Sequence, residues 1–141
     1  MKPRLFLLFL LPALLFCEGE RHPIPEISFQ FTIDVTNPEF SDLQAIPGYV
    51  YVTGGAYEKG IIIYRKDFDA FAAYDRSCPH DPETGLIEVV ETNIGLAVDS
   101  VCGSEFSLQF DGTVQKGPSK HPLKMYNTHY NPNTQLLEVY N

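Results

Sequence analysis

Basic residues are scarce in this sequence, and tryptophan is absent. The 141 residues include 10 Lys and Arg against 18 Asp and Glu, which gives a formal net charge of −8. Phosphate binding needs clustered Lys and Arg, and the sequence contains no basic patch. Nucleic acid is therefore excluded as a partner, and the length is that of one domain with a real core.

The apolar run at the N-terminus is too short to cross a membrane. Residues 5–16 would reach about 18 Å as a helix, against a hydrocarbon core of about 30 Å. Lys2 and Arg4 give the start of the chain the positive charge that is typical of a secretory signal. We therefore predict that residues 1–16 are a signal peptide and that the protein is exported.

Cys17 directly follows that run, in the order Leu-Leu-Phe-Cys. This order resembles a bacterial lipoprotein box, in which the Cys is lipidated, although the place of Phe16 usually takes Gly, Ala or Ser. We expect a lipoprotein held at a membrane surface through Cys17, in the periplasm or on the cell surface. An ordinary signal peptide cut elsewhere is the alternative. Residues 17–26, with Pro23 and Pro25, are predicted to be the lipid-anchored linker.

Long helical patterns are also lacking, and short alternating segments take their place. Residues 27–35 alternate apolar and polar side chains without a lapse, as a half-buried strand does. Asp111-Gly112 predicts a two-residue hairpin turn, and a short helical turn is expected around Leu43. Further strands are predicted at 49–52, 61–64, 71–74, 87–90, 96–98, 106–110, near 114, at 125–130 and at 136–140. With 11 Pro and 10 Gly as turn formers, the chain is predicted to be an all-β antiparallel sandwich or small barrel.

The same patterns predict the core. In residues 106–110, Phe106, Leu108 and Phe110 alternate up to the hairpin turn. The residues expected to be buried are Phe29, Phe31, Ile33, Ile62, Phe106 and Leu108. Truncation of Phe31 or Phe106 to Ala is then expected to cost about 3–5 kcal/mol.

Two short segments carry the residues best suited to chemistry. The first reads Ser-Cys-Pro-His and contains Cys78 and His80; the second, residues 99–104, reads Asp-Ser-Val-Cys-Gly-Ser. A thiolate close to an imidazole, with a second thiolate later in the chain, suits a small metal or iron–sulfur site. The second segment continues into Phe106, the hairpin turn and Gly117-Pro118.

These motifs resemble those of a Rieske iron–sulfur domain, in which C-x-H is followed by C-x-x-H-G-S-x-F, D-G and G-P. With Gly103, Ser104 and Phe106 aligned to that pattern, Asp99 replaces a Cys and Cys102 replaces a His. The order of residues 60–65, 73–79 and 102–106 is also similar to that in Rieske-like lipoproteins of the Bacteroidetes kind. The resemblance implies a Rieske-like fold over residues 27–141, with two loops of the cluster-binding type.

A [2Fe–2S] cluster and electron transfer are what the resemblance implies for function. Its ligands would be Cys78, His80, Asp99 and Cys102, surrounded by Gly103, Ser104, Gly117 and Pro118. One iron would take Cys78 and Asp99, and the other His80 and Cys102. Three anionic ligands would lower the potential below the Rieske range of about −150 to +300 mV. The protein would then be no enzyme itself but an electron carrier or subunit with an unidentified redox partner.

Other interpretations of the two segments remain open. A Rieske fold without a cluster would act as a structural or binding module, its loops joined by a Cys78–Cys102 disulfide. A single zinc ion held by Cys78, His80 and Cys102 is a further possibility. Thiol hydrolase chemistry is unfavoured, because no oxyanion hole or third catalytic residue is evident. Every surviving interpretation requires the two loops to lie side by side, with Gly117-Pro118 adjacent.

Overall fold

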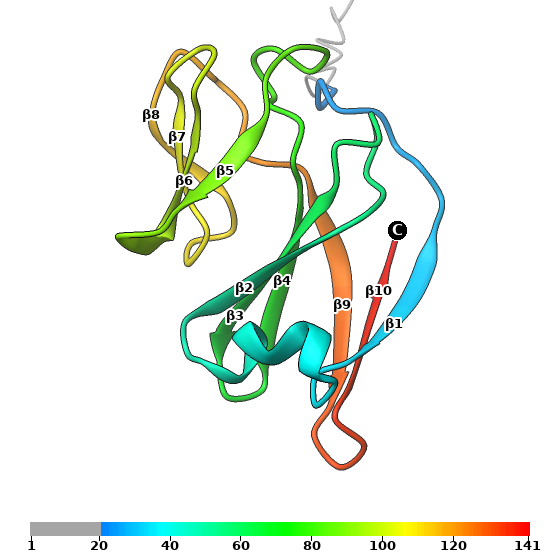
Figure 1. Cartoon of the computed structure of the whole chain (residues 1–141). Helices are drawn as coiled ribbons and strands as arrows, with labels where there is room; N and C mark the ends of the chain where they lie inside the picture. The colour runs from blue at the N-terminus through cyan, green and yellow to red at the C-terminus, as the bar shows by residue number, and fades with distance from the viewer. Residues whose placement is uncertain (1–20) are drawn as a thin grey trace, which may run out of the picture.

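A computed structural model describes residues 21–141 of the chain, and the predictions for Cys17 and for residues 1–16 lie outside that range. Within it, ten strands and one short 3₁₀ helix follow one another (Figure 1). Their bounds are β1 (Gln30–Asp34), η1 (Pro38–Gln44), β2 (Gly48–Val52), β3 (Ile61–Asp67), β4 (Ala70–Asp75), β5 (Ile87–Val90), β6 (Asn93–Asp99), β7 (Glu105–Ser107), β8 (Thr113–Lys116), β9 (Met125–Asn131) and β10 (Leu136–Tyr140). Across residues 21–141, no helix has the length and apolar character needed to span a bilayer.

The strands form two antiparallel sheets. A six-stranded sheet has the order β1-β10-β9-β4-β3-β2, and a four-stranded sheet has the order β5-β6-β7-β8. Figure 1 shows the smaller sheet as a lobe beside one end of the larger one. The predicted all-β antiparallel fold, with a helical turn around Leu43, is confirmed.

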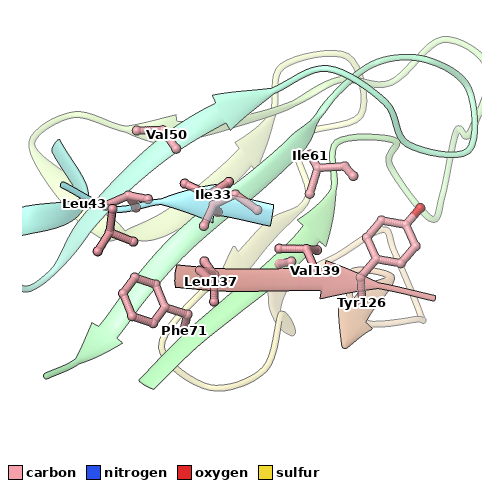
Figure 2. Packing of buried hydrophobic residues seen from close by; sticks show 11 residues of the cluster. Ile33, Leu43, Val50, Ile61, Phe71, Tyr126, Leu137 and Val139 are labelled. Atoms are coloured by element: carbon pink, nitrogen blue, oxygen red, sulfur yellow. The ribbon is translucent and has the colours of Figure 1, made fainter. Parts of the chain in front are cut away.

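Strands β3 and β4 are buried on both faces, which explains the continuous apolar run in β3. Ile61 and Ile63 point into a first hydrophobic cluster, which the six-stranded sheet closes with Ile33, Leu137 and other side chains (Figure 2). Ile62 and Tyr64, which alternate with them, point into a second cluster beneath the four-stranded sheet. A strand with apolar residues on both faces is expected where layers pack against each of its sides.

The second cluster contains Phe106 and Leu108, both fully buried as predicted. Residues 108–110 form a turn and Phe110 is 68% exposed, so the predicted extension of the strand to residue 110 is wrong. The ladder of β7 ends at Ser107, and the alternation therefore does not continue through residues 108–110. The predicted turn does form: Asp111 and Gly112 have φ of 53° and 70°, and Thr113 N–H donates to Phe110 C=O at 3.1 Å.

The first strand is shorter than its alternation predicts. Its ladder with β10 covers only Gln30–Asp34, at the edge of the sheet. Ile33 is buried, as predicted, whereas Phe29 and Phe31 are half-buried and stack on each other at the rim of the first cluster. Phe29 and Phe31, predicted to be core residues, thus pack against the core but are only partly buried.

Part of the predicted linker packs on the domain. Ile24 is 1% exposed, and its N–H donates to His22 Nδ1 at 3.1 Å. His22 Nε2 lies 2.9 Å from Pro122 C=O, and Glu26 pairs with Lys124. The chain is therefore held against the folded domain from His22 onward.

Candidate functional site: two thiols and a carboxylate between neighbouring loops

The first loop, residues 76–86, begins at a buried carboxylate. Asp75 is fully buried at the end of β4, where it accepts hydrogen bonds from Ala56 N–H at 2.6 Å and Ser77 N–H at 2.7 Å. The Tyr126 hydroxyl donates to the same carboxylate at 2.6 Å, and burial together with this hydrogen bond raises the pKa of Tyr126. These bonds fix the backbone immediately before Cys78.

A tight turn then brings the loop back over Cys78. Gly85 N–H donates to Asp81 C=O at 2.7 Å, and Lys59 Nζ bonds Gly85 C=O at 2.7 Å. A Cβ at residue 85 would lie 2.5 Å from both Cys78 Cβ and Asp99 Oδ2. Only glycine fits here, so the first loop packs directly on the carboxylate of the second.

The second loop, residues 99–104, is closed by its own hydrogen bonds. Asp99 N–H donates to Ser104 C=O at 2.9 Å, and Gly103 N–H donates to Asp99 C=O at 2.8 Å. Val101 N–H donates to Asp99 Oδ1 at 2.9 Å. Gly103 has φ of 78°, a conformation that glycine adopts without strain. The loop thus directs the Asp99 carboxylate and the Cys102 thiol to the same side.

Three of the four predicted ligands come together between these loops. The ligand atoms of Cys78, Asp99 and Cys102 all lie within 4.8 Å of one another. The two sulfurs are 3.6 Å apart, and Cys102 Sγ is 3.1 Å from Asp99 Oδ2. Cys78 and Asp99 are fully buried, while Cys102 is half-buried. The group is therefore reached from solvent through Cys102.

The electrostatics of the group favour a neutral Cys78 thiol beside an ionised Asp99 carboxylate. Burial, reinforced by the hydrogen bond to Asp99, raises the pKa of Cys78 to about 12. Burial on its own would raise the pKa of Asp99, but hydrogen bonds from Cys78, Val101, Cys102 and Leu86 outweigh it and lower that pKa. At neutral pH the Cys78 thiol therefore keeps its proton beside the ionised Asp99 carboxylate.

A third loop supports the group from the side. Ser104 is fully buried, with its Oγ 3.1 Å from Cys102 Sγ. Ser119 N–H donates to that same Oγ at 2.9 Å, so the chain just after Gly117-Pro118 is adjacent to the second loop. Gly117 and Pro118 themselves are exposed. The three loops lie side by side, as expected.

His80 lies apart from the gathered group. It is exposed, and its Nε2 lies 3.9 Å from Asp81 Oδ2. Among the described residues, the ligand atoms gathered within 4.8 Å belong to Cys78, Asp99 and Cys102 alone. Two residues of separation from Cys78 do not bring the imidazole into the group, because the chain turns outward after Pro79.

The spacing within the group limits what it can hold. Two thiolates on one tetrahedral zinc ion, each bonded at about 2.3 Å, lie about 3.8 Å apart. The observed 3.6 Å is close to that value, and it is about 1.5 Å longer than a disulfide bond of roughly 2.05 Å. The spacing therefore suits two ligands of a single ion, and a disulfide requires the two sulfurs to move together by about 1.5 Å.

The four-ligand set of a [2Fe–2S] cluster does not fit this arrangement. Cys78 and Cys102 were expected on different irons, yet their sulfurs approach as closely as two ligands of one atom. The imidazole expected on the second iron lies outside the group. Gly85 packs against both Cys78 and Asp99, which leaves the first loop in direct contact with the second.

Several supporting residues are not predicted from the sequence motifs. Gly85 and Ser119 make the close contacts between loops, and Asp75 holds the start of the first loop. Ser119 directly follows Gly117-Pro118, and this position is the signal that could have identified it. Asp75 and Gly85 carry no comparable signal, because their partners lie in distant parts of the chain.

A solved structure shows limited similarity to this chain. No family model matches the chain, and no curated protein matches it. The chain is similar to a structure described as a putative NADH-dependent nitrite reductase small subunit from Mycobacterium tuberculosis. The two share 16% sequence identity over 82% of this chain and 97% of the other, with a TM-score of 0.48.

Proposed function

We propose that this chain is an exported Rieske-like domain, anchored to a membrane through Cys17, whose loop site carries a thiol pair in place of an iron–sulfur cluster. It would serve as a structural or binding module, with the two loops joined by a Cys78–Cys102 disulfide. One observation carries the proposal: the sulfurs lie 3.6 Å apart in a group that leaves His80 outside.

The order of motifs along the chain supports the Rieske-like assignment. The loop of residues 99–104, which contains Gly103-Ser104, is closed by hydrogen bonds and leads to buried Phe106. The Asp111-Gly112 turn follows the end of β7. The segment after Gly117-Pro118 then returns to contact Ser104. Two loops and a third supporting segment at one end of a β-domain are the arrangement that the motifs imply.

Disulfide formation requires an oxidant, which we assign to a disulfide-bearing partner in the oxidising compartment. Cys102, the more accessible thiol, loses its proton and attacks that disulfide, which gives a mixed disulfide and releases one partner thiol. Cys78 then loses its proton and displaces the second partner thiol. Two thiols are oxidised, one disulfide is reduced, and the two protons end on the partner's sulfurs.

The environment of Cys78 favours a stable structural disulfide over a site of reversible thiol–disulfide exchange. Its thiol is fully buried and its pKa is raised to about 12, so little thiolate is present at neutral pH. Reactive cysteines have lowered pKa values and partial exposure, the opposite of this environment. Closing a loop of this length contributes about 3 kcal/mol to stability in the chain-entropy account.

Cofactor and thiol content test the proposal together. Protein purified from the exported fraction should be colourless, contain no iron or acid-labile sulfide, and show no free thiol at Cys78 or Cys102 under denaturing conditions. Reduction should release two thiols and raise the mass of the chain by two hydrogens. Cys102→Ser should leave one free thiol at Cys78, which serves as the matched control.

A second candidate, electron transfer through a [2Fe–2S] cluster, would require His80 to turn into the group, and one contact favours it. The Cys102 thiol donates to Ser104 Oγ at 3.1 Å. A Cys102 thiolate bound to iron would instead accept a hydrogen bond from the Ser104 hydroxyl, and such bonds tune the potentials of these centres. Brown protein with two irons and two sulfides per chain, lost in the Cys78→Ser variant, would establish this candidate and overturn the disulfide. A redox partner protein would then be required.

Membrane anchoring is tested separately. Labelled palmitate supplied to the source cell should enter the protein, and Cys17→Ser should abolish the label and release the domain into the soluble fraction. A wild-type protein that takes up no label and washes off with buffer would reject the anchor while leaving the thiol site untouched.

A further inference from the structure

We propose that the anchored domain rests with its loop end against the bilayer, so that the Cys78–Cys102 site faces lipid headgroups. The loop end is defined here as residues 78–86, 99–104 and 117–122. This inference rests on lipidation of Cys17 and adds an orientation to it. The inference assigns the loop end as a membrane-binding surface. Any partner that reacts with the two thiols must then be membrane-associated.

The free part of the tether is short. The chain is held on the domain from His22, through bonds to Pro122 C=O and to Ile24 N–H. Ile24 is buried, and Glu26 pairs with Lys124, so this segment is fixed at several points. From Cys17 to His22 the chain spans at most about 18 Å when fully extended. The lipid therefore lies within that distance of His22.

The tether joins the domain at the loop end. His22 contacts Pro122, and its ring lies 5.9 Å from the ring of His121 in an edge-on arrangement. Ser119, two residues before His121, bonds Ser104 beside the thiol group. Figure 1 shows the start of the described chain, in blue, at the same end as the turns before β5 and β7. A short tether attached there holds this end toward the bilayer.

Charge is distributed unevenly between the two ends. Signal cleavage would remove Lys2 and Arg4, which changes the formal net charge from −8 to −10. Most of the remaining basic residues lie toward the loop end, where Lys116 and Lys124 pair with Glu105 and Glu26. They are Arg21, Lys59, Arg76, Lys116, Lys120 and Lys124. The same end also carries acids, with Asp75 and Asp99 buried and Glu26, Glu58, Asp81, Glu83 and Glu105 outside the core.

The opposite end carries a similar number of acids but fewer bases. Its acids lie at the end of β1, in η1 and in the turns after β3 and β7, with Arg65 and Lys66 as the nearby bases. These acids are Asp34, Glu39, Asp42, Asp67, Asp69 and Asp111. With two bases against six acids, this end is repelled by anionic headgroups more strongly than the loop end, whose six bases offset the five acids outside its core. The repulsion acts within about a Debye length, roughly 8 Å, and favours an orientation with the more acidic end facing away.

The loop end also presents an apolar contact beside the site. Val101 is 60% exposed in the second loop, next to half-buried Cys102. An exposed aliphatic side chain at the tip of a loop fits the boundary between headgroups and acyl chains. The competing orientation would place the opposite end against the bilayer, because Phe68 is 74% exposed there, in the turn between β3 and β4.

The absence of tryptophan makes the orientation measurable. Val101→Trp and Phe68→Trp each introduce a single fluorescent ring, one at either end of the domain. The lipidated protein would be reconstituted in phosphatidylethanolamine–phosphatidylglycerol vesicles that carry a dansyl headgroup acceptor. We expect the fluorescence of Val101→Trp to fall by at least about half and that of Phe68→Trp to change little. Equal transfer from both variants, or stronger transfer from Phe68→Trp, would overturn the orientation.

Flotation of the same samples separates the two hypotheses. Protein that does not float with the vesicles refutes the lipid anchor; protein that floats with equal transfer at both ends refutes the orientation alone. Insertion of about 30 Gly and Ser residues after Glu20 gives a tether with a mean span of about 30 Å. This variant should still float, but the difference between the two tryptophans should shrink. An unchanged difference would show that the surface binds lipid without help from the short tether.

Discussion

The two hydrophobic clusters on either face of β3 and β4 differ in what they carry. The first is built almost entirely from aliphatic and aromatic carbon, and Figure 2 shows Leu137 and Val139 of β10 within it. The second includes the Cys78 thiol and lies next to Asp99 and Cys102. One face of the same strand pair thus supports the fold, while the other supports the candidate site.

The polar links to the smaller sheet explain how the second cluster positions the site. The Tyr74 hydroxyl donates to Leu108 C=O at 2.7 Å, and the Tyr64 hydroxyl donates to Gln109 Oε1 at 3.2 Å. Burial raises the pKa of both hydroxyls, which therefore remain donors. The comparison of the two clusters predicts that a substitution in the second cluster lowers stability and also changes the reactivity of the thiols. A substitution in the first cluster should lower stability alone.

The largest effect should come from Phe106, which is fully buried in the second cluster. Phe106→Ala should lower the free energy of unfolding by about 3–5 kcal/mol, through lost burial and the cavity left behind. It should also speed alkylation of Cys102 in the reduced native protein. Urea unfolding and timed labelling with iodoacetamide measure the two effects.

Leu137→Ala is the matched variant in the first cluster. Leu137 is fully buried, so truncation should cost about 2–5 kcal/mol. Labelling of Cys102, measured well below the unfolding transition, should keep its wild-type rate. If both variants accelerate labelling equally, the two clusters are coupled and the proposed division is wrong.

Gly85→Ala should give the next largest effect, because it separates the two loops directly. The added Cβ would meet Cys78 and Asp99 at 2.5 Å, and relief of that overlap should cost about 1–3 kcal/mol. Disulfide formation on air oxidation should slow. Gly103→Ala is the control: its Cβ meets nothing within 4 Å, so only its positive φ is penalised and the thiol spacing should be retained.

Buried tyrosines of both clusters should make stability fall at high pH. Tyr126 faces the first cluster and Tyr74 the second, and burial raises the pKa of each above its ordinary value of about 10. The folded state therefore binds protons more tightly, so the stabilisation is complete below pH 10 and declines as pH rises. Tyr74→Phe or Tyr126→Phe should each lower the free energy of unfolding at pH 7 by about 1 kcal/mol and flatten the alkaline decline. Urea unfolding at a series of pH values tests this, and an unchanged slope in both variants would contradict it.

Sequence patterns predicted the elements with a clear local period. The continuous apolar run of β3 and the Asp111-Gly112 turn were predicted correctly, because each depends on neighbouring residues only. The extent of β1 depends instead on where its partner strand ends, which local alternation does not report.

The site was less predictable than the strands. The resemblance to Rieske motifs implied that Cys78, Asp99 and Cys102 lie together, and the structure gathers these three residues. The same resemblance also placed His80 in the group, but the structure has it outside, exposed beside Asp81. Loop conformation is determined by contacts with distant residues such as Lys59, and no short motif encodes them.

Phe110 should give the smallest effect, although the sequence pattern makes it equivalent to Phe106. It follows the end of β7 and is 68% exposed, so truncation removes little buried area. Phe110→Ser should change the free energy of unfolding by less than about 0.5 kcal/mol, as for other surface positions. The same urea unfolding experiment measures it beside Phe106→Ala. A loss above about 2 kcal/mol would mean that the strand continues through residue 110 and that the second cluster extends to the Asp111-Gly112 turn.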